Sequence, residues 1–317
     1  MTAKPARVFD MFTSLPTPER VALEIRSWGR EAGYRKMFGE RWSGLLGLQP
    51  GTVDWVADLP QKDFLAVASE RLRTELPPAE HFVERLRDAG VRRAVIHGPL
   101  PVDVPAPDEL TSALVERFPA FLVGFARVDL RDGGAAAAAA LEDSVVRLGL
   151  RGATYTPFWH ATPASDSALA PVLETAQRLG VPIWIHTSMH WRREVPLDVE
   201  HPRHIDEIAG KYPDLTIICG HGGWPWMPDM VAVAWRHPNV YIDVSAFRPR
   251  NIFKAGSGWE ALVQYGEKVI SEKILIGTTW ALLGTEPATI VDEAAAAPWP
   301  EAVRDRWMYS NAERLLG

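Results

Sequence analysis

Eight short apolar segments, spread along the whole chain, constrain the fold more than any other feature of the sequence. They occupy residues 7–12, 92–97, 121–128, 152–156, 182–186, 215–219, 240–244 and 274–277. Most are rich in valine, isoleucine or aromatic residues and are bounded by glycine or proline, which is typical of strands buried on both faces of a parallel sheet. Helical spacing of apolar residues separates the later segments, at 136–148, 167–179, 203–212, 230–236 and 258–269. This alternation predicts an α/β fold, a (β/α)8 TIM-type barrel.

The exception to the alternation is residues 15–90, between the first two apolar segments. This stretch contains Trp28, Trp42 and Trp55 and ends in an amphipathic pattern at 79–89. A structureless loop of that length is uncommon in a compact domain. We therefore expect a mostly helical insertion that covers the barrel mouth, within a single domain spanning residues 1–317. A packed accessory layer without a catalytic part is the other open interpretation.

Charge and composition exclude several functional classes. The chain has a net charge of −6 and no cluster of lysine and arginine, so neither nucleic-acid binding nor a polybasic membrane contact is expected. No apolar run approaches the roughly 18 residues that span a bilayer, and the first residues lack the apolar core of a signal peptide. The single cysteine, Cys219, lies in an apolar segment and is expected to be a buried thiol. A cytoplasmic location fits these features.

Active sites of such barrels lie at the carboxyl ends of the strands, so the residues that end each segment are the candidates. His186 and His221 end neighbouring segments and are candidates for general acid–base catalysis. Arg127 is a candidate for binding a substrate carboxylate, with an ion pair to Asp129 as the alternative. The other candidates for substrate contact are mainly aromatic and indicate an apolar pocket: Phe12, Ser14, Trp159, Trp191, Trp224, Asp243, Thr279 and Trp280.

Several motifs resemble the amidohydrolase superfamily, in particular the subfamily related to aminocarboxymuconate-semialdehyde decarboxylase. They are Pro-Ile-Trp-Ile-His at 182–186, Phe-Pro-Ala-Phe-Leu-Val-Gly-Phe-Ala at 118–126, Tyr-Pro-Asp-Leu-Thr-Ile-Ile-Cys-Gly-His-Gly-Gly at 212–223, and Ser-Asn-Ala-Glu-Arg-Leu-Leu-Gly at 310–317. The resemblance implies a distorted barrel that decarboxylates, hydrolyses or hydrates small aromatic or unsaturated acids. It also implies a divalent metal, usually zinc. The implied ligands are a His-x-His on the first strand, one histidine on the fifth and an aspartate after the eighth.

Three of those four ligand positions are occupied by other residues in this chain. The His-x-His positions hold Phe12 and Ser14, and the aspartate position holds Thr279. Phenylalanine offers no ligand atom, and neutral hydroxyls are poor ligands for zinc. Only His186, together with the sixth-strand His221, matches the family pattern. We therefore expect no cofactor, while a zinc site with the non-standard ligands Asp10, His186, His221 and Asp243 remains an alternative.

The favoured hypothesis is a metal-independent enzyme in which His186 and His221 move protons on a small, carboxylated aromatic or unsaturated metabolite. Lyase, isomerase, cyclase and lactone-hydrolase reactions need only such groups. One alternative is a metal-dependent hydrolase or decarboxylase with the non-standard ligands. Another is a non-catalytic relative that binds a ligand or a partner protein. The expected partner is a small molecule, and the resemblance implies a homodimer.

Overall fold

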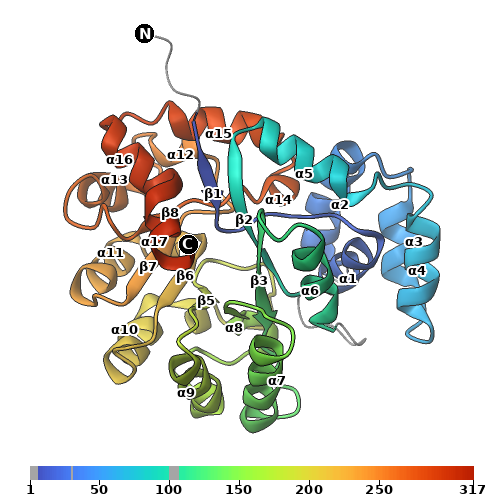
Figure 1. Cartoon of the computed structure of the whole chain (residues 1–317), viewed down its shortest axis with the longest axis horizontal. Coiled ribbons are helices and arrows are strands. Elements are labelled where there is room, and N and C mark those ends of the chain that lie inside the picture. Colours follow the sequence, from blue (N-terminus) through green and yellow to red (C-terminus); the bar gives the residue numbers. More distant parts are fainter. Residues whose placement is uncertain (1–5, 30, 100–106) are drawn as a thin grey trace.

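The computed structural model of the protein describes residues 6–29, 31–99 and 107–317. Its strands form one parallel sheet in which each strand pairs with the next along the chain, from β1 to β8 (Figure 1). They are β1 (Val8–Asp10), β2 (Val91–His97), β3 (Leu122–Arg127), β4 (Ala153–Tyr155), β5 (Ile183–His186), β6 (Ile217–Gly220), β7 (Val240–Asp243) and β8 (Ile274–Leu275). Each overlaps one of the apolar segments, and the predicted TIM-type barrel is confirmed.

The barrel is joined between β8 and β1 by main-chain hydrogen bonds just beyond the strand ends. Met11 N–H donates to the Ile276 carbonyl at 2.8 Å, and Thr279 N–H donates to the Phe12 carbonyl at 2.8 Å. Gly277 makes this approach possible, because a Cβ there would lie 2.8 Å from the Phe12 nitrogen. Residues that follow β1 and β8 are therefore neighbours at the carboxyl ends of the strands.

Side chains fill the barrel interior, and the C-terminal helix α17 (Asn311–Leu316) closes one end of it (Figure 1). The interior cluster consists of Phe9, Met11, Val95, Val123, Phe125, Trp184, Ile218 and Leu275 with Ala312 and Leu316. Arg93, near the start of β2, donates to the Leu316 carbonyl at 3.3 Å. Helix α17 therefore covers the amino ends of the strands and leaves the carboxyl ends for a site.

One main helix follows each strand from β2 onward and packs on the outside of the barrel (Figure 1). These helices are α6 (Glu109–Arg117), α7 (Gly134–Val146), α9 (Ala170–Leu179), α10 (Pro202–Lys211), α11 (Met227–Arg236), α13 (Glu260–Gly266) and α15 (Pro287–Ala295). Shorter pieces are α8 (Pro157–His160), α12 (Pro249–Ile252), α14 (Trp280–Leu283), α16 (Glu301–Asp305), η1 (Ser167–Leu169), η2 (Leu197–Glu200), η3 (His221–Gly223) and η4 (Arg306–Ser310).

Helix boundaries agree with the sequence patterns to within a few residues. Gly180 ends α9 with a φ of 67°, the left-handed conformation expected of a glycine at that position. The largest difference is α13, which begins two residues later and ends three residues earlier than the pattern at 258–269. Gly256 and Gly258 delay its start, because both have a positive φ, of 74° and 84°.

The described residues between β1 and β2 are mostly helical, as predicted. They form α1 (Pro18–Trp28), α2 (Ala32–Leu46), α3 (Thr52–Asp58), α4 (Phe64–Leu72) and α5 (Ala79–Asp88). In Figure 1, α1 to α4 lie together to one side of the strands. The ring of Trp280, in α14, stacks on that of Phe82, in α5, with centroids 5.8 Å apart. The insertion is therefore packed directly against the segment that follows β8.

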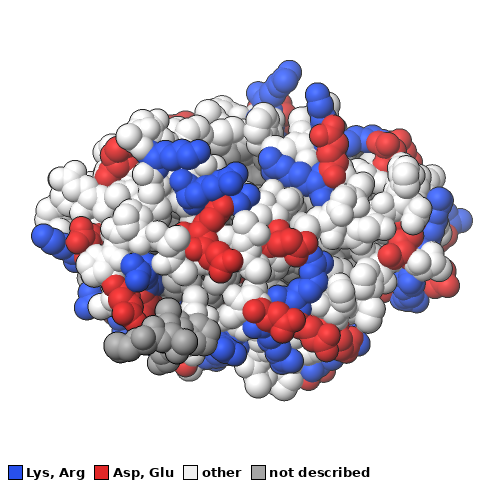
Figure 2. Space-filling view, turned by 90° about the horizontal axis from the view of Figure 1, so that it is seen from above, with Lys and Arg blue, Asp and Glu red and all other residues white. Residues whose placement is uncertain are grey.

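The surface carries both charge signs in close alternation on the face shown in Figure 2. Ion pairs across the surface include Arg147 with Glu109 and Asp143, and Arg35 with Asp54 and Asp58. None of the helices that the structure describes combines the length and apolar character needed to cross a membrane.

Candidate active site

A cavity of about 320 Å³ lies at the carboxyl ends of the strands. Its inner part is formed by residues that end or follow the strands, and its outer part by helices α1 and α2 of the insertion. Aromatic side chains dominate the lining: Phe12, Trp28, Tyr34, Trp42, Phe158, Trp159, Trp184, Trp191 and Phe247. Such a mainly apolar cavity with a few polar groups is typical of a small-molecule site.

The structure brings seven of the sequence-predicted residues to this cavity: Phe12, Ser14, Trp159, His186, Trp191, His221 and Thr279. Trp224 and Trp280 do not line it. Trp280 is buried and donates its indole N–H to the Ser14 carbonyl at 2.9 Å. The Trp224 ring packs beside Phe247, with centroids 6.0 Å apart. Both tryptophans therefore pack against residues that line the cavity.

Backbone conformation is unusual at three of the strand ends that form the cavity. His221, Ala246 and Thr279 follow β6, β7 and β8, and each has a positive φ, of 60°, 63° and 39°. Residues other than glycine rarely adopt this left-handed conformation, and such strain concentrates at functional sites. Thr279 Oγ1 accepts a hydrogen bond from Ala246 N–H at 2.6 Å, which links two of these turns.

His221 is connected to a buried aspartate through a serine. Its Nδ1 lies 2.8 Å from Ser245 Oγ, and that hydroxyl donates to Asp243 Oδ2 at 2.5 Å. Because the serine proton goes to Asp243, Nδ1 carries the proton in the other hydrogen bond, and Nε2 keeps its lone pair. Nε2 makes no hydrogen bond with a described residue. It is therefore the atom of this ring that is free to accept a proton from a ligand.

His186 is paired with a buried glutamate instead. Its Nδ1 lies 2.9 Å from Glu200 Oε2, and Phe158 N–H donates to the other carboxyl oxygen at 2.9 Å. Burial lowers the pKa of His186 to about 3 and raises the pKa of Glu200 well above its usual range. These shifts favour a neutral pair in which the carboxyl proton is donated to Nδ1 and the imidazole proton lies on Nε2.

The two imidazoles lie in contact with one another. Their ring centroids are 4.9 Å apart and their planes are nearly perpendicular, at 82°. Burial lowers the pKa of His221 well below its usual value, and the neighbouring His186 lowers it further. Both rings are therefore neutral near pH 7. In the tautomers that their partners favour, one presents a hydrogen-bond donor and the other an acceptor.

Phe12 lies between His221 and a third histidine, His97. Its ring stacks on His97 with centroids 4.1 Å apart and lies 5.3 Å from the ring of His221. His97 Nε2 donates to the Met11 carbonyl at 2.9 Å, and Nδ1 accepts from Thr154 Oγ1 at 2.7 Å. Both nitrogens of His97 are used within the protein, so this histidine positions Phe12 and is not available to a ligand.

The residues at the implied metal positions do not fit a metal ion. Phe12 places an apolar ring beside His221, and the Thr279 hydroxyl is committed to a main-chain N–H. Ser14 adds at most a neutral hydroxyl, a poor ligand for zinc or manganese. Among the described residues, no three histidine, cysteine, aspartate or glutamate side chains are arranged to hold a metal.

The alternative ligand set of Asp10, His186, His221 and Asp243 is not assembled either. Asp10 accepts hydrogen bonds from the Thr278 N–H at 2.7 Å and from the Thr278 hydroxyl at 2.5 Å. Asp243 accepts from the Trp184 indole at 2.9 Å, and burial raises its pKa to about 7. Both carboxyl groups are fully buried and neither lines the cavity. Asp243, predicted from sequence to contact the substrate, therefore lies outside the cavity lining.

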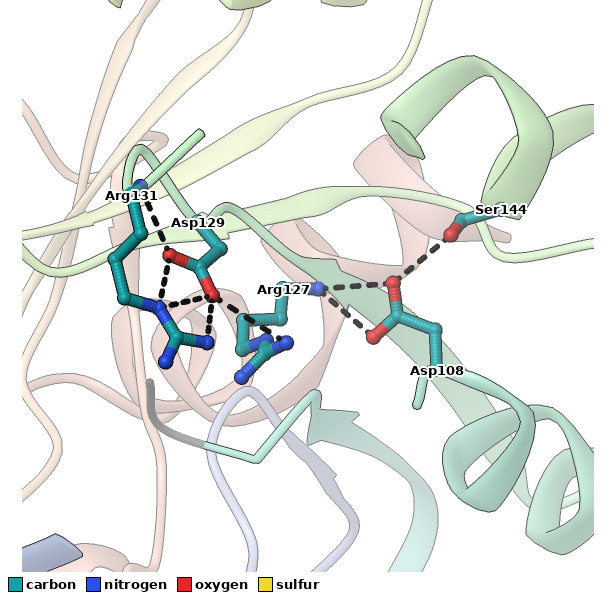
Figure 3. Close-up of polar contacts among 5 residues, drawn as sticks. All are labelled: Asp108, Arg127, Asp129, Arg131 and Ser144. Atoms are coloured by element: carbon teal, nitrogen blue, oxygen red, sulfur yellow. Dashed lines mark hydrogen bonds and ion pairs between the residues drawn. The ribbon is translucent and has the colours of Figure 1, made fainter. Parts of the chain in front are cut away.

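Arg127 also departs from its predicted position. Its guanidinium pairs with Asp129 at 3.5 Å, and its main-chain N–H donates to Asp108 at 3.1 Å (Figure 3). Asp129 binds Arg131 as well, and Asp108 accepts from Ser144. Arg127 does not line the cavity. The ion pair with Asp129, the alternative considered for this residue, is the arrangement that forms.

Sequence reasoning missed the charged residues that the insertion brings to the cavity. Arg20 and Glu24 of α1 and Arg41 of α2 all line it. Arg41 Nη1 donates to the Leu282 carbonyl at 2.9 Å and forms no ion pair with a described carboxylate. Gly284 leaves room for its side chain, because a Cβ there would lie 2.7 Å from Arg41 Cγ. The signal available in the sequence was the helical spacing of charges in an insertion expected to cover the mouth.

Comparison with known proteins agrees with this architecture. The family model described as Amidohydrolase matches residues 104–317, about two thirds of the chain. No curated protein sequence matches the chain. An uncharacterised TIM-barrel protein from Bordetella bronchiseptica is similar in structure, with a TM-score of 0.73, 20% sequence identity and 98% of each chain covered.

Two further solved structures are similar to this chain and have a stated activity. One is 5-carboxyvanillate decarboxylase from Sphingomonas paucimobilis, with a TM-score of 0.63, 16% identity and 98% of each chain covered. The other is a dihydroxybenzoic acid decarboxylase from Polaromonas with bound manganese and the inhibitor 2-nitroresorcinol. It has a TM-score of 0.58 and 19% identity, with 84% of this chain and 93% of that chain covered. At these identities the similarity shows a shared fold.

Proposed function

The chain belongs to the amidohydrolase family, and on that premise we propose that it is a lyase acting on a small aromatic or unsaturated carboxylic acid. The proposed chemistry is proton transfer by His186 and His221 without a metal ion. The observation that carries this proposal is the contact between two neutral imidazoles, 4.9 Å apart, in a cavity lined by aromatic side chains. Decarboxylation is the favoured reaction, because similar solved structures are decarboxylases of aromatic acids.

The two histidines divide the proton transfers between them. Decarboxylation of an aromatic acid requires a proton to be added to the ring carbon that carries the carboxylate. The bond to the carboxylate carbon then breaks, its electron pair returns to the ring and carbon dioxide leaves. We assign the proton donor role to His186 Nε2. As Nε2 gives its proton to the ring carbon, the Glu200 carboxyl proton passes to Nδ1, so the imidazole stays neutral and Glu200 is left ionised until solvent reprotonates it. His221 Nε2, with its lone pair, accepts a proton from a ring substituent and returns it after carbon dioxide leaves, and Ser245 and Asp243 hold its tautomer.

Arg41 is the group that we assign to the substrate carboxylate, in place of Arg127. It lines the cavity and forms no ion pair with a described acidic side chain, so its charge is available to an anion. Charge-assisted hydrogen bonds to a carboxylate contribute about 1.5–3 kcal/mol. Helix α2 therefore supplies the binding charge, while the strand ends supply the proton-transfer groups.

A metal-dependent decarboxylase is the second candidate. The observation in its favour is the manganese bound in the similar Polaromonas enzyme. His186 and His221 are the residues of this chain that could contribute to such a site. The non-standard set that adds Asp10 and Asp243 is opposed by the hydrogen bonds that both carboxyl groups make within the protein.

Turnover of hydroxylated benzoic acids by the chelator-treated protein tests the proposal, with carbon dioxide release as the readout. We expect turnover to survive removal of metal ions. We also expect Arg41→Ala to raise KM by roughly 10- to 100-fold with a smaller change in kcat, since it removes one charge-assisted contact. Arg35→Ala is the matched control, because Arg35 lies on the same helix and pairs with Asp54 and Asp58 at the surface.

Two results would contradict this assignment. Activity that disappears with chelator and returns with manganese would favour the second candidate. An unchanged KM in Arg41→Ala, with normal folding, would show that the carboxylate is bound elsewhere.

A further inference from the structure

We infer that Glu24 is a specificity-determining residue of the cavity, whose carboxyl group binds a hydrogen-bond donor on the ring of the ligand, a hydroxyl or an amino group. The inference rests on the proposed function only in taking the ligand to be a small aromatic acid. Helix α1 would then recognise a ring substituent of the ligand, whereas the residues that end the strands transfer protons.

Glu24 is directed to the cavity by the geometry of its helix. Arg20, Glu24 and Trp28 are four residues apart in α1, and all three line the cavity. Residues with this spacing lie on one face of an α-helix. The same helix buries Val21 and Ile25 against the protein core, so its register is fixed by packing. Packing of the helix therefore holds Glu24 at the cavity.

The neighbouring arginine does not satisfy the Glu24 carboxyl group. Arg20 Nη2 donates to the His97 carbonyl at 2.7 Å, and Nη1 donates to Thr111 Oγ1 at 3.3 Å. Its charge is close enough to favour the ionised form of Glu24, but the two side chains form no ion pair. Among the residues that the structure describes, Glu24 has no hydrogen-bond or ion-pair partner. Glu24 is half-buried at the cavity, so its carboxyl oxygens are left to a ligand or to water in the cavity.

The surroundings indicate what kind of group the carboxyl would bind. Partial burial of Glu24 at the cavity raises its pKa, and the charge of Arg20 opposes that rise. Carboxyl oxygens accept hydrogen bonds in either protonation state. A ligand carboxylate would be repelled by the ionised form and is better placed at Arg41. The partner of Glu24 is therefore a donor elsewhere on the same ligand, which makes the ligand a hydroxy- or amino-substituted aromatic acid.

Equilibrium binding to the purified full chain, measured by calorimetry after chelation, tests this inference without requiring turnover. The probes are benzoate, the 3- and 4-hydroxybenzoates, and the 3- and 4-aminobenzoates. We expect the wild-type protein to bind at least one substituted probe about tenfold or more tighter than benzoate, since a site built around a polar group disfavours analogues that lack its partner. The hydroxyl and amino probes distinguish the two donor chemistries.

Three variants complete the experiment. Glu24→Leu is expected to reduce the preference over benzoate to less than about twofold, whereas Glu24→Gln, which keeps a carbonyl acceptor, retains most of it. Glu19→Leu is the matched control, because Glu19 lies on the same helix, pairs with Arg73 and is absent from the cavity lining. The thermal transition of each variant reports folding. If Glu24→Leu does not fold, Glu24→Ala is measured in its place, and the same loss of preference over benzoate is expected.

The inference is overturned if the wild-type protein binds benzoate as tightly as every substituted probe. It is also overturned if a folded Glu24→Leu or Glu24→Ala keeps the wild-type preference. Failure of the proposed function is a separate result. If the protein binds a substituted probe in preference to benzoate but releases no carbon dioxide, the Glu24 inference stands and the proposed lyase activity is wrong.

Discussion

Replacing His221 with alanine is expected to reduce turnover of the aromatic acid by roughly 10²- to 10⁴-fold, the usual contribution of a general acid–base group. His186→Ala is expected to have an effect of the same size, because each imidazole handles a different proton. Steady-state carbon dioxide release measures both. His237→Ala is the matched control, since His237 pairs with Asp206 on the outside of the barrel. Full activity in one variant would remove that histidine from the chemistry, and full activity in both would remove the pair.

The pH dependence of turnover provides an independent check on the same pair. A general base with an ordinary histidine pKa of about 6.5 loses activity tenfold per pH unit below that value. Burial lowers the pKa of His186 to about 3 and that of His221 well below 6.5, so both rings stay neutral on mild acidification. Turnover is therefore expected to change little between pH 6 and 5, below the range in which Asp243, with a pKa of about 7, takes up a proton. A tenfold loss of turnover across that pH unit in a folded protein would contradict the buried, neutral pair.

Trp184→Ala is expected to cause the largest loss of stability, about 3–5 kcal/mol in the free energy of unfolding. Trp184 is 1% exposed, belongs to the cluster that fills the barrel interior and lines the inner part of the cavity. Its ring lies 5.0 Å from that of Phe12 and 5.1 Å from that of His221. A Cβ on Gly220 would lie 1.9 Å from Trp184 Cζ2, so the neighbouring strand is built around this ring.

Denaturant unfolding measures this effect, and two further variants identify its origin. Trp184→Phe keeps most of the volume and loses the hydrogen bond to Asp243, so we expect a loss of about 1–3 kcal/mol. Trp235→Ala is the control, because Trp235 is 56% exposed on α11 and should change stability by less than about 1 kcal/mol. A loss below 1 kcal/mol for Trp184→Ala would show that this ring does not support the cavity.

The fold was predictable because each strand of a parallel barrel is buried on both faces and therefore forms a continuous apolar segment. The eight strands of the structure follow those segments. The inner part of the cavity was predictable for the related reason that residues ending the strands converge at one end of the barrel. His186, His221, Phe12 and Thr279, which end or follow strands, all line the cavity.

Side-chain direction at those ends could not be predicted in the same way. Arg127 and Asp243 also lie at the carboxyl ends of their strands. Arg127 forms an ion pair with Asp129, and Asp243 is buried and accepts a hydrogen bond from the Trp184 indole. Glu200 pairs with His186 from a separate 3₁₀ turn, and no spacing in the sequence indicates that contact. Such contacts depend on tertiary packing that a one-dimensional pattern does not contain.

The charged residues contributed by the insertion were missed for a different reason. The insertion was expected to be helical and to cover the mouth, but the register of its helices over the barrel was unknown. That register determines that Arg41 and Glu24 line the cavity while Arg35 and Glu19 pair at the surface. A shift of one residue along α1 or α2 would rotate the helix by about 100° and turn Glu24 or Arg41 away from the cavity.

Metal content of the purified full chain, after growth in medium supplemented with manganese and zinc, tests the central claim most directly. The claim is that Phe12, Ser14 and Thr279 leave too few donor atoms for an ion and that the paired histidines act without one. Elemental analysis of the wild-type protein and of His186→Ala should find far less than one ion per chain in both, with turnover of the wild-type protein unaffected by chelation. One ion per wild-type chain that is lost in His186→Ala would contradict the account.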